Sequence, residues 1–424
     1  MAILAGLFGP SHSLSSHDNW LHRALGGGKT HSGASVSEHT ALNISGVYRA
    51  VSVISDTIAQ LPIHVWRRTD DGRQVVTDHP VATALRMRPN PHMTPFSQQQ
   101  VCQSHGLLWG NGYAEIARNG RGQAAELWPL MADCTRPERR DDGSLVYRTV
   151  VDGESIPIPG RNVVHIRNLG HCGYIGHSPI WLHRQGLGLA LAAEEFGGKF
   201  FGNDAKSGGF IEVPGTLPEG GAKNIQNSLS DSQGGLKNAH RVKILEAGMK
   251  FVQTTIPPDD AQFLSTREFQ IAEIARMYGV PLVLMQSHEK TTSWGSGIEH
   301  LLIGFVTWTL TPWIVQWEQE LNWKLFTEEE RREGLFVKFA LQALLRGDMA
   351  SRAGFYKTLR EISALTPNEI RELEDLDPDP RLDVFHSPAN WQEVGQPDPA
   401  AADRESTQQL RRAMASALRP TDVG

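Results

Sequence analysis

LSTREFQIAEIARMYGVP, residues 264–281, defines the organisation of the chain better than any other stretch. Leu264, Ile271, Ile274 and Tyr278 recur at helical spacing and fall on one face, and Gly279 with Pro281 forms a typical helix stop. The stretch therefore predicts an amphipathic helix over about 259–279 that ends abruptly.

A polar loop and a second, longer helix are predicted to follow this helix. Residues 286–297, QSHEKTTSWGSG, are typical of a loop, and a long helix follows over about 298–326, in which Pro312 predicts a kink or break because it lacks an amide proton. Residues 301–317, LLIGFVTWTLTPWIVQW, contain no formal charge but are interrupted by threonines, a proline and a glutamine, and are flanked by glutamates. We expect a buried or subunit-facing helix, with a membrane anchor as the alternative.

The segments before residue 259 predict another helix and a small inserted unit. Ser178-Pro179 can cap a helix that runs to about residue 201. Residues 208–258 mix strand-like runs with a polar helix near 221–232, which predicts a compact αβ insertion between the two helices.

The first part of the chain predicts helices followed by an antiparallel β region. Residues 1–42, rich in Gly, Ser and His, predict a mobile arm. An apolar stripe over 47–61 predicts a helix capped by Asn43 or Ser45, Asp71-Gly72 predicts a hairpin, and Thr94-Pro95 begins a second helix. Short strand-like runs over 113–167 are separated by Asn-Gly and Asp-Gly turns. Together with the helices they indicate an α+β fold.

The last part of the chain returns to strand and helix. LFVKFAL, residues 335–341, is typical of a buried strand, and Thr366-Pro367-Asn368-Glu369 is a capping box for a short helix. From residue 391 the chain is rich in Pro and Ala, which predicts a flexible tail.

Composition excludes several classes of protein. The chain has 424 residues, enough for about three domains of ordinary size, and 41 Lys and Arg against 47 Asp and Glu give a net charge of −6. A basic protein that wraps DNA by neutralising phosphates is excluded. The three cysteines form no Cys-x-x-Cys pair, so synthesis in a reducing cytoplasm is expected, and the N-terminus does not resemble a signal peptide.

Motifs for catalysis, metal or cofactor binding are incomplete. Gly26-Gly27-Gly28-Lys29-Thr30 resembles the end of a phosphate-binding loop, but Arg23 replaces its first glycine and no strand precedes it. Ser296 lacks the first glycine of a nucleophile elbow, because Trp294 stands there. The 17 histidines include no metal-binding pair beside a glutamate, and His79, His92 and His165 are expected to be structural. We therefore expect no enzyme, no metal and no cofactor.

Tryptophans and one lysine stand out near the predicted long helix. Trp308, Trp313 and Trp317 could stack on nucleic-acid bases, but aromatic residues at helical spacing more often fill cores or subunit interfaces. Between Arg276 and Lys324 the sequence has one Lys or Arg, Lys290, in the predicted loop. A solvated lysine is the simplest interpretation.

The order and spacing of several motifs resemble one known family. These motifs are PNPHMTPFSQQ (89–99), LLWGNGYAEI (107–116), NVVHIRN (162–168), FFGNDAKSGG (200–209), REFQIAEIARMYGVP (267–281), TLTPWIVQWEQELNWKLF (309–326), LLRGDMASRAGFYK (344–357) and LTPNEIRELEDL (365–376). Over about residues 40–390 the chain is similar to the portal proteins of tailed bacteriophages.

The resemblance implies an elongated subunit built of named modules. In this chain the wing would be 43–177 completed by 298–345, the stem helices 178–207 and 259–285, and the clip 208–258 between them. The tunnel loop would be 286–297 and the crown 346–390, between the arm 1–42 and the tail 391–424.

The resemblance also implies function, partners and site residues. Twelve subunits would form a ring at one capsid vertex of the virion, and double-stranded DNA would pass through its channel during packaging and ejection. The ring would dock the terminase large subunit, then a head-completion or adaptor protein, and would contact the major capsid or scaffold protein. The implied residues are Lys290, Thr291, Thr292 and Ser293 in the channel, Lys223, Lys237, Arg241 and Lys243 for motor or adaptor contact, and Trp308, Trp313 and Trp317 for packing between subunits.

Two alternatives from other classes stay open on the sequence. One is a DNA-processing enzyme of the packaging machinery, such as a nuclease or ATPase. The other is a membrane-associated injection protein anchored by residues 301–317.

Overall fold

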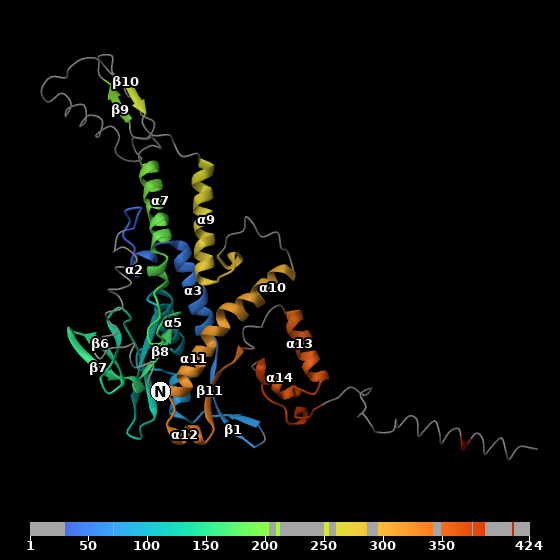
Figure 1. Ribbon diagram of the computed structural model, residues 1–424. Coiled ribbons are helices and arrows are strands. Elements are labelled where there is room, and N and C mark those ends of the chain that lie inside the picture. Colours follow the sequence, from blue (N-terminus) through green and yellow to red (C-terminus); the bar gives the residue numbers. More distant parts are fainter. Residues whose placement is uncertain are drawn as a thin grey trace, which may run out of the picture. The chain divides into compact units, whose positions relative to one another are not determined.

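Figure 1 shows the computed structural model of the protein, which describes residues 30–70, 72–202, 209–212, 250–253, 260–285, 296–341, 349–374, 376–385 and 409–410. The chain divides into two compact units, Met1–Leu341 and Gln342–Gly424. Both helices and antiparallel strands build the first unit, so the predicted α+β class is confirmed.

The first unit begins earlier than the sequence indicated. Helix α2 (Glu38–Ala41) carries a capping box between Ser37 and Thr40, and Ala41 is fully buried. The prediction that the arm extends to residue 42 is therefore wrong for its last part. Short polar residues such as Ser37 and Thr40 are common in flexible linkers, but here they cap a helix. Composition alone does not distinguish these two roles.

The predicted apolar stripe forms helix α3 (Ser45–Ala59), which packs against α5 (Pro95–Leu108). Its cap differs from the prediction, because Ile44 is the N-cap residue and makes no side-chain cap hydrogen bond. The α5 cap is confirmed: the amide of Ser97 donates to Thr94 Oγ1 at 3.2 Å, and Pro95 opens the helix.

One sheet joins the two ends of the first unit. Strand β1 (Ile63–Thr69) pairs with β2 (Gly72–Val75) on one side and with β11 (Leu335–Phe339) on the other, both antiparallel. The register sets Val65 opposite Val337, and both are buried. Helix α4 (Pro80–Arg86) contacts β1. The pairing of β1 with β2 confirms the predicted hairpin, although Asp71 lies outside the described residues. The strand predicted over 335–341 forms over Leu335–Phe339.

Two further antiparallel sheets form the predicted β region. One has the order β4-β3-β8 and the other β5-β6-β7; their strands are β3 (Asn111–Arg118), β4 (Ala124–Leu130), β5 (Thr135–Arg139), β6 (Leu145–Val151), β7 (Glu154–Pro159) and β8 (Val163–Arg167). A cluster of buried side chains that includes Tyr113, Tyr147 and Val163 packs between them. Asp152 and Gly153 both have positive φ, as the tight β6–β7 turn requires.

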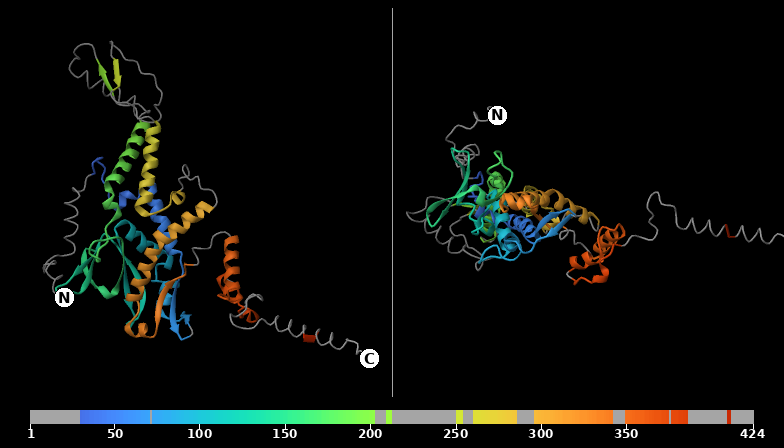
Figure 2. Two further views of the ribbon diagram at one scale, coloured as in Figure 1. Left: turned by 45° about the vertical axis from the view of Figure 1, so that its right-hand side comes forward. Right: turned by 90° about the horizontal axis from the view of Figure 1, so that it is seen from below.

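Two long helices lie side by side above this β region in Figure 1, and the left view of Figure 2 shows the same pairing. They are α7 (Arg184–Gly202) and α9 (Asp260–Tyr278). The helix predicted to start at Ser178 is two helices, because α6 (Pro179–Leu182) ends at His183 before α7 begins. Between α7 and α9, the antiparallel strands β9 (Gly209–Glu212) and β10 (Lys250–Gln253) form a hairpin-like pair, and the helix predicted near 221–232 lies outside the described residues.

The long helix around Pro312 is continuous, so of the predicted kink or break the break does not occur, and the irregularity takes the form of a π-helical segment. Helix α10 (Ser296–Phe305) passes through a π-helical segment, η4 (Val306–Leu310), into α11 (Thr311–Lys324). The amide of Thr311 donates to the carbonyl of Val306, five residues earlier. A proline would clash with the carbonyl four residues before it, that of Trp308, and the wider π turn relieves this clash without ending the helix.

The end of this helix leads back into the sheets. Helix α12 (Glu328–Arg332) follows α11, and its capping box joins Thr327 to Glu330. Strand β11 comes next, which returns the chain to β1.

The second unit contains α13 (Met349–Glu361), α14 (Pro367–Leu373) and the 3₁₀ turn η6 (Pro380–Leu382). The predicted capping box is confirmed, since the Thr366 amide donates to Glu369 Oε2 at 2.7 Å and the Glu369 amide to Thr366 Oγ1 at 3.2 Å. Tyr356 of α13 donates a 2.6 Å hydrogen bond to Glu374, which links α13 to the end of α14.

Candidate functional site

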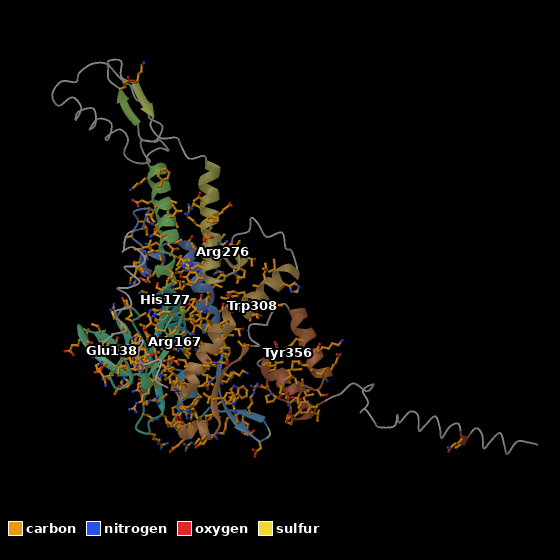
Figure 3. All side chains as sticks on the ribbon, in the orientation of Figure 1. Glu138, Arg167, His177, Arg276, Trp308 and Tyr356 are labelled. Carbon is orange, nitrogen blue, oxygen red and sulfur yellow. The ribbon has the colours of Figure 1, made fainter. Side chains whose placement is uncertain are left out.

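The feature most relevant to function is the helical rod α10–η4–α11 and the groove beside it. α11 contacts β8 and β11, and so attaches the rod to two sheets. Three segments distant in sequence meet beside the π-helical turn: the end of α9, the rod itself, and the loop after β8. Figure 3 labels two residues of this junction: Arg167, the last residue of β8, and Trp308, in the π-helical turn of the rod.

A hydrogen bond holds the rod to the end of α9. Thr309 Oγ1 donates to the carbonyl of Gly279 at 2.7 Å. Gly279 has φ +68, and an added Cβ would lie 2.8 Å from Thr309 Oγ1. The helix stop that the sequence predicted is therefore also a contact surface for the rod.

Buried charges attach the other end of the rod to the β region. Lys324 Nζ donates to the carbonyl of Gly160 at 2.6 Å, while the amide of His165 donates to Glu320 Oε1 at 3.2 Å. Burial raises the pKa of Glu320 and lowers the pKa of Lys324. Such groups are costly to bury unless they are paired, so this end of the rod can take few other arrangements.

His165 is a structural residue, as predicted. It is fully buried, and hydrogen bonds join its ring to Tyr147 at 3.1 Å and to Asn111 Oδ1 at 3.0 Å. Burial lowers the pKa of His165 well below its ordinary value. A neutral imidazole is expected there at physiological pH.

His79 is likewise part of a structural network. Its Nε2 lies 2.9 Å from Glu330 Oε1, which also accepts a 2.8 Å hydrogen bond from Gln123. Burial by itself raises the pKa of Glu330, but hydrogen bonds from the Thr327 amide, Gln123 and His79 outweigh burial and lower it overall. The network joins α4, the β3–β4 turn and α12.

A groove of about 670 Å³ opens beside the π-helical turn. It is lined by residues 277–279 at the end of α9, by the rod between Trp308 and Gln316, and by the loop after β8 from Arg167 to Ile175. The amide of Arg167 donates to Gln316 Oε1 at 3.0 Å, and its guanidinium donates to the carbonyl of Gly173 at 3.0 Å. The first contact holds the end of β8 against the rod, and the second ties the loop to the end of β8.

The three tryptophans predicted to pack between subunits occupy different environments. Trp308 is 81% exposed on the rim of the groove, and Trp313 is half-buried, with its ring close to Gly106 of α5. Trp317 is only 1% exposed, and its Nε1 donates to Gln103 at 2.8 Å. The prediction for Trp317 is therefore wrong: it belongs to the core of its own subunit, because its helix face is turned toward α5.

The rod exposes other apolar side chains. Leu301, Leu302 and Ile303 follow one another on α10, and all three are exposed, as are Val315 and Trp323 on α11. Three successive residues cover a wide arc of a helix, so α10 is uncovered over much of its surface. Contiguous exposed apolar surface marks an interaction site.

The other predicted site residues belong to the predicted tunnel loop and clip. Lys290, Thr291, Thr292 and Ser293 lie outside the described residues, and so do Lys223, Lys237, Arg241 and Lys243. Among the residues that are described, no cluster of His, Cys, Asp or Glu could hold a metal ion. In that same part of the chain, no helix is both long and apolar enough to cross a membrane.

Sequence reasoning missed the groove. Pro312 was the available signal for it, because a proline inside a long helix marks a local irregularity, but the partners that complete the groove are 30 to 150 residues away in the chain. Arg167 and Leu169 had no distinguishing pattern of their own.

Comparisons with known proteins agree with the resemblance seen in the sequence. The family model described as phage portal protein matches residues 45–375. The portal protein of Enterobacteria phage HK97 is 34% identical over 362 residues, 84% of this chain and 84% of that protein.

Two solved structures share the fold. A HK97 family phage portal protein from Corynebacterium diphtheriae has a TM-score of 0.56 and 17% identity, covering 74% of this chain and 98% of that one. A chain of the neck of a gene transfer agent particle, computed with C12 symmetry, has a TM-score of 0.52 and 22% identity, covering 85% of this chain and 99% of that one.

Proposed function

The chain belongs to the phage portal protein family, and from this premise we propose how it serves as the connector at a capsid vertex. The family is a structural one rather than an enzyme family. We infer a ring of twelve identical subunits, in keeping with the twelvefold symmetry used for the similar neck structure. Its central channel would carry double-stranded DNA in both packaging and ejection.

The exposed apolar side of the rod is the observation that carries the proposal of a ring. Leu301, Leu302, Ile303 and Trp308 are exposed in the single subunit although the segment has no formal charge. Burying such a surface stabilises an assembly by roughly 25 cal/mol per Å² of apolar area. A neighbouring subunit covers it without any need for a membrane.

The modules of the subunit follow the resemblance. We assign α7 and α9 to the stem, residues 208–258 to the clip, 286–297 to the tunnel loop, and the second unit to the crown. The wing would consist of residues 43–177 and 298–345, which the pairing of β1 with β11 supports. The ring would be part of the virion and its subunits would be made in the host cytoplasm.

DNA would pass through the ring without sequence-specific contacts. Each phosphate that a cation neutralises adds affinity through release of counterions, so a strongly basic channel would retard DNA. The net charge of −6 suits a channel that lets DNA slide. We propose Lys290, beside Thr291, Thr292 and Ser293, as a transient phosphate contact supplied once by each subunit.

The clip would dock the packaging motor. Lys223, Lys237, Arg241 and Lys243 are its cationic candidates for contact with the terminase large subunit, or later with a head-completion or adaptor protein. Major capsid or scaffold protein would contact the ring from the capsid side.

Imaging of the purified full-length chain tests the ring directly. Negative-stain particle images are expected to show rings with a central hole, and native mass measurement should give about twelve subunits. A protein that stays monomeric at high concentration, also in the presence of scaffold and capsid proteins, would contradict the proposal.

A further inference from the structure

The groove beside the π-helical turn and the exposed helix α10 are two uncovered surfaces on one chain. α10 supplies none of the residues that line the groove, although both belong to the same rod. The exposed side chains Leu301, Leu302 and Ile303 of α10 therefore do not fill the groove of their own subunit.

Their chemistry is complementary. The lining of the groove combines the apolar side chains of Leu169, Ile175 and Trp308 with one formally charged residue, Arg167. α10, SGIEHLLIGF, combines an apolar run with one formally charged residue of opposite sign, Glu299. The sequence of the helix and the lining of the groove thus carry formal charges of opposite sign.

Size also fits. Pockets of about 300–1,000 Å³ enclose ligands of drug size, and the groove, at about 670 Å³, has room for a few aliphatic side chains of a helix. Its walls are held by the Thr309–Gly279 and Arg167–Gln316 hydrogen bonds, so it is formed before any partner arrives.

Two different surfaces on one chain that fit each other produce a head-to-tail contact, and such contacts close into rings when the rotation between subunits permits. We propose that α10 of one subunit binds in the groove between α9, η4 and the β8–α6 loop of its neighbour. This inference rests on the proposed ring and identifies the occupant of the groove as a second copy of the chain.

Disulfide trapping between two differently marked subunits tests the contact. Both chains carry Cys134→Ser and Cys172→Ser, while the buried Cys102 stays, because burial raises the pKa of its thiol to about 12 and suppresses its reactivity. One chain has Leu169→Cys on the groove rim, where the leucine is 81% exposed; the other, with an affinity tag, has Ile303→Cys on α10. Because each chain has one new cysteine, a disulfide between them must join two subunits.

Coexpressed rings are expected to give a tagged–untagged dimer on non-reducing gels, and neither variant alone should give one. The matched control replaces Ile303→Cys by Trp323→Cys, which is also an exposed position on the rod. At 1.5 Å per residue, Trp323 lies roughly 20 Å along the rod from Trp308, on the side away from α10. This control should give at most a tenth of the dimer.

The outcomes separate the two proposals. One outcome would overturn the inference: intact rings that form no disulfide dimer between Leu169→Cys and any of Ile303→Cys, Leu301→Cys or Leu302→Cys. The proposed ring would remain valid, and the groove would then bind another molecule. If the unsubstituted chain forms no ring, the proposed function fails and the inference fails with it.

Discussion

Thr309 in the π-helical turn donates a 2.7 Å hydrogen bond to the carbonyl of Gly279, the residue that ends α9. This single contact joins the helix proposed as part of the stem to the rod proposed as part of the wing. It also forms one wall of the groove in which we place the neighbouring subunit's α10.

Gly279→Ala should destabilise the subunit by about 1–2 kcal/mol. The left-handed φ of +68 costs an L-residue about that much, and the new methyl group would press on Thr309 Oγ1. Gly198→Ala is the matched control, because Gly198 lies inside α7 with no atom within 4 Å of an added Cβ. It should stabilise the subunit by about 0.5–1 kcal/mol. Urea denaturation of unassembled subunits measures both, and equal effects of the two substitutions would contradict the argument.

Trp308→Ala and Trp317→Phe should affect different properties. Loss of the exposed Trp308 should weaken each subunit contact by at least about 2 kcal/mol, as for aromatic residues at interface centres, and leave subunit stability almost unchanged. Trp317→Phe removes the Nε1 donor and leaves the buried Gln103 Oε1 without that hydrogen bond, so subunit stability should fall by about 1–3 kcal/mol. Rings should still form. Analytical ultracentrifugation and thermal unfolding measure the two effects, and a reversed pattern would refute the assignment.

Acid should destabilise the subunit through Glu330. Hydrogen bonds lower the pKa of this carboxyl in the folded state, so its contribution to stability is complete above the ordinary glutamate pKa of about 4.3 and is lost as the pH falls through the lower folded value. Glu330→Gln should cost about 1.5–3 kcal/mol at pH 7 and flatten the fall of stability below about pH 4.5. Glu329→Gln, on the exposed side of the same helix, should change neither. Denaturation curves between pH 3 and 7 provide the measurement.

Lys290→Ala should leave ring assembly intact and change the amount of DNA packaged or retained. The substitution removes one cation per subunit from an otherwise uncharged stretch between Glu289 and Glu299, so the salt dependence of DNA retention should also decrease. Lys338→Ala, at an exposed position of β11, is the control. Unchanged packaging rate and genome length in the Lys290 variant would exclude a role for this lysine.

Charge reversal in the clip should weaken docking of the motor. Arg241→Glu with Lys243→Glu should reduce binding of the terminase large subunit by about tenfold or more and leave rings unchanged. Pull-down with purified rings measures it; undiminished binding would remove these residues from the docking surface.

Local signals in the sequence predicted most elements of the fold. The caps at Thr94 and Thr366, the Asp-Gly turns at 142–143 and 152–153, and the helix stop at Gly279 all depend on interactions within a few residues, and the structure confirms each of them. Predictions that depended on distant partners succeeded less often. Trp317 looked like Trp308 in the sequence, because nothing local distinguishes a side chain that meets Gln103 from one that meets solvent.

The sequence by itself determined the family, the α+β class, the positions of most of the long helices and the absence of formal charge from residues 301–317. Only the tertiary structure decided that Pro312 is accommodated by a π-helical turn rather than a break, and that Arg167, Gly279 and Trp308 line one groove. Helix periodicity and capping are local, so they can be read from neighbouring residues. A groove depends on which segments pack together, and the free energy of that packing comes from buried contacts between residues far apart in the chain.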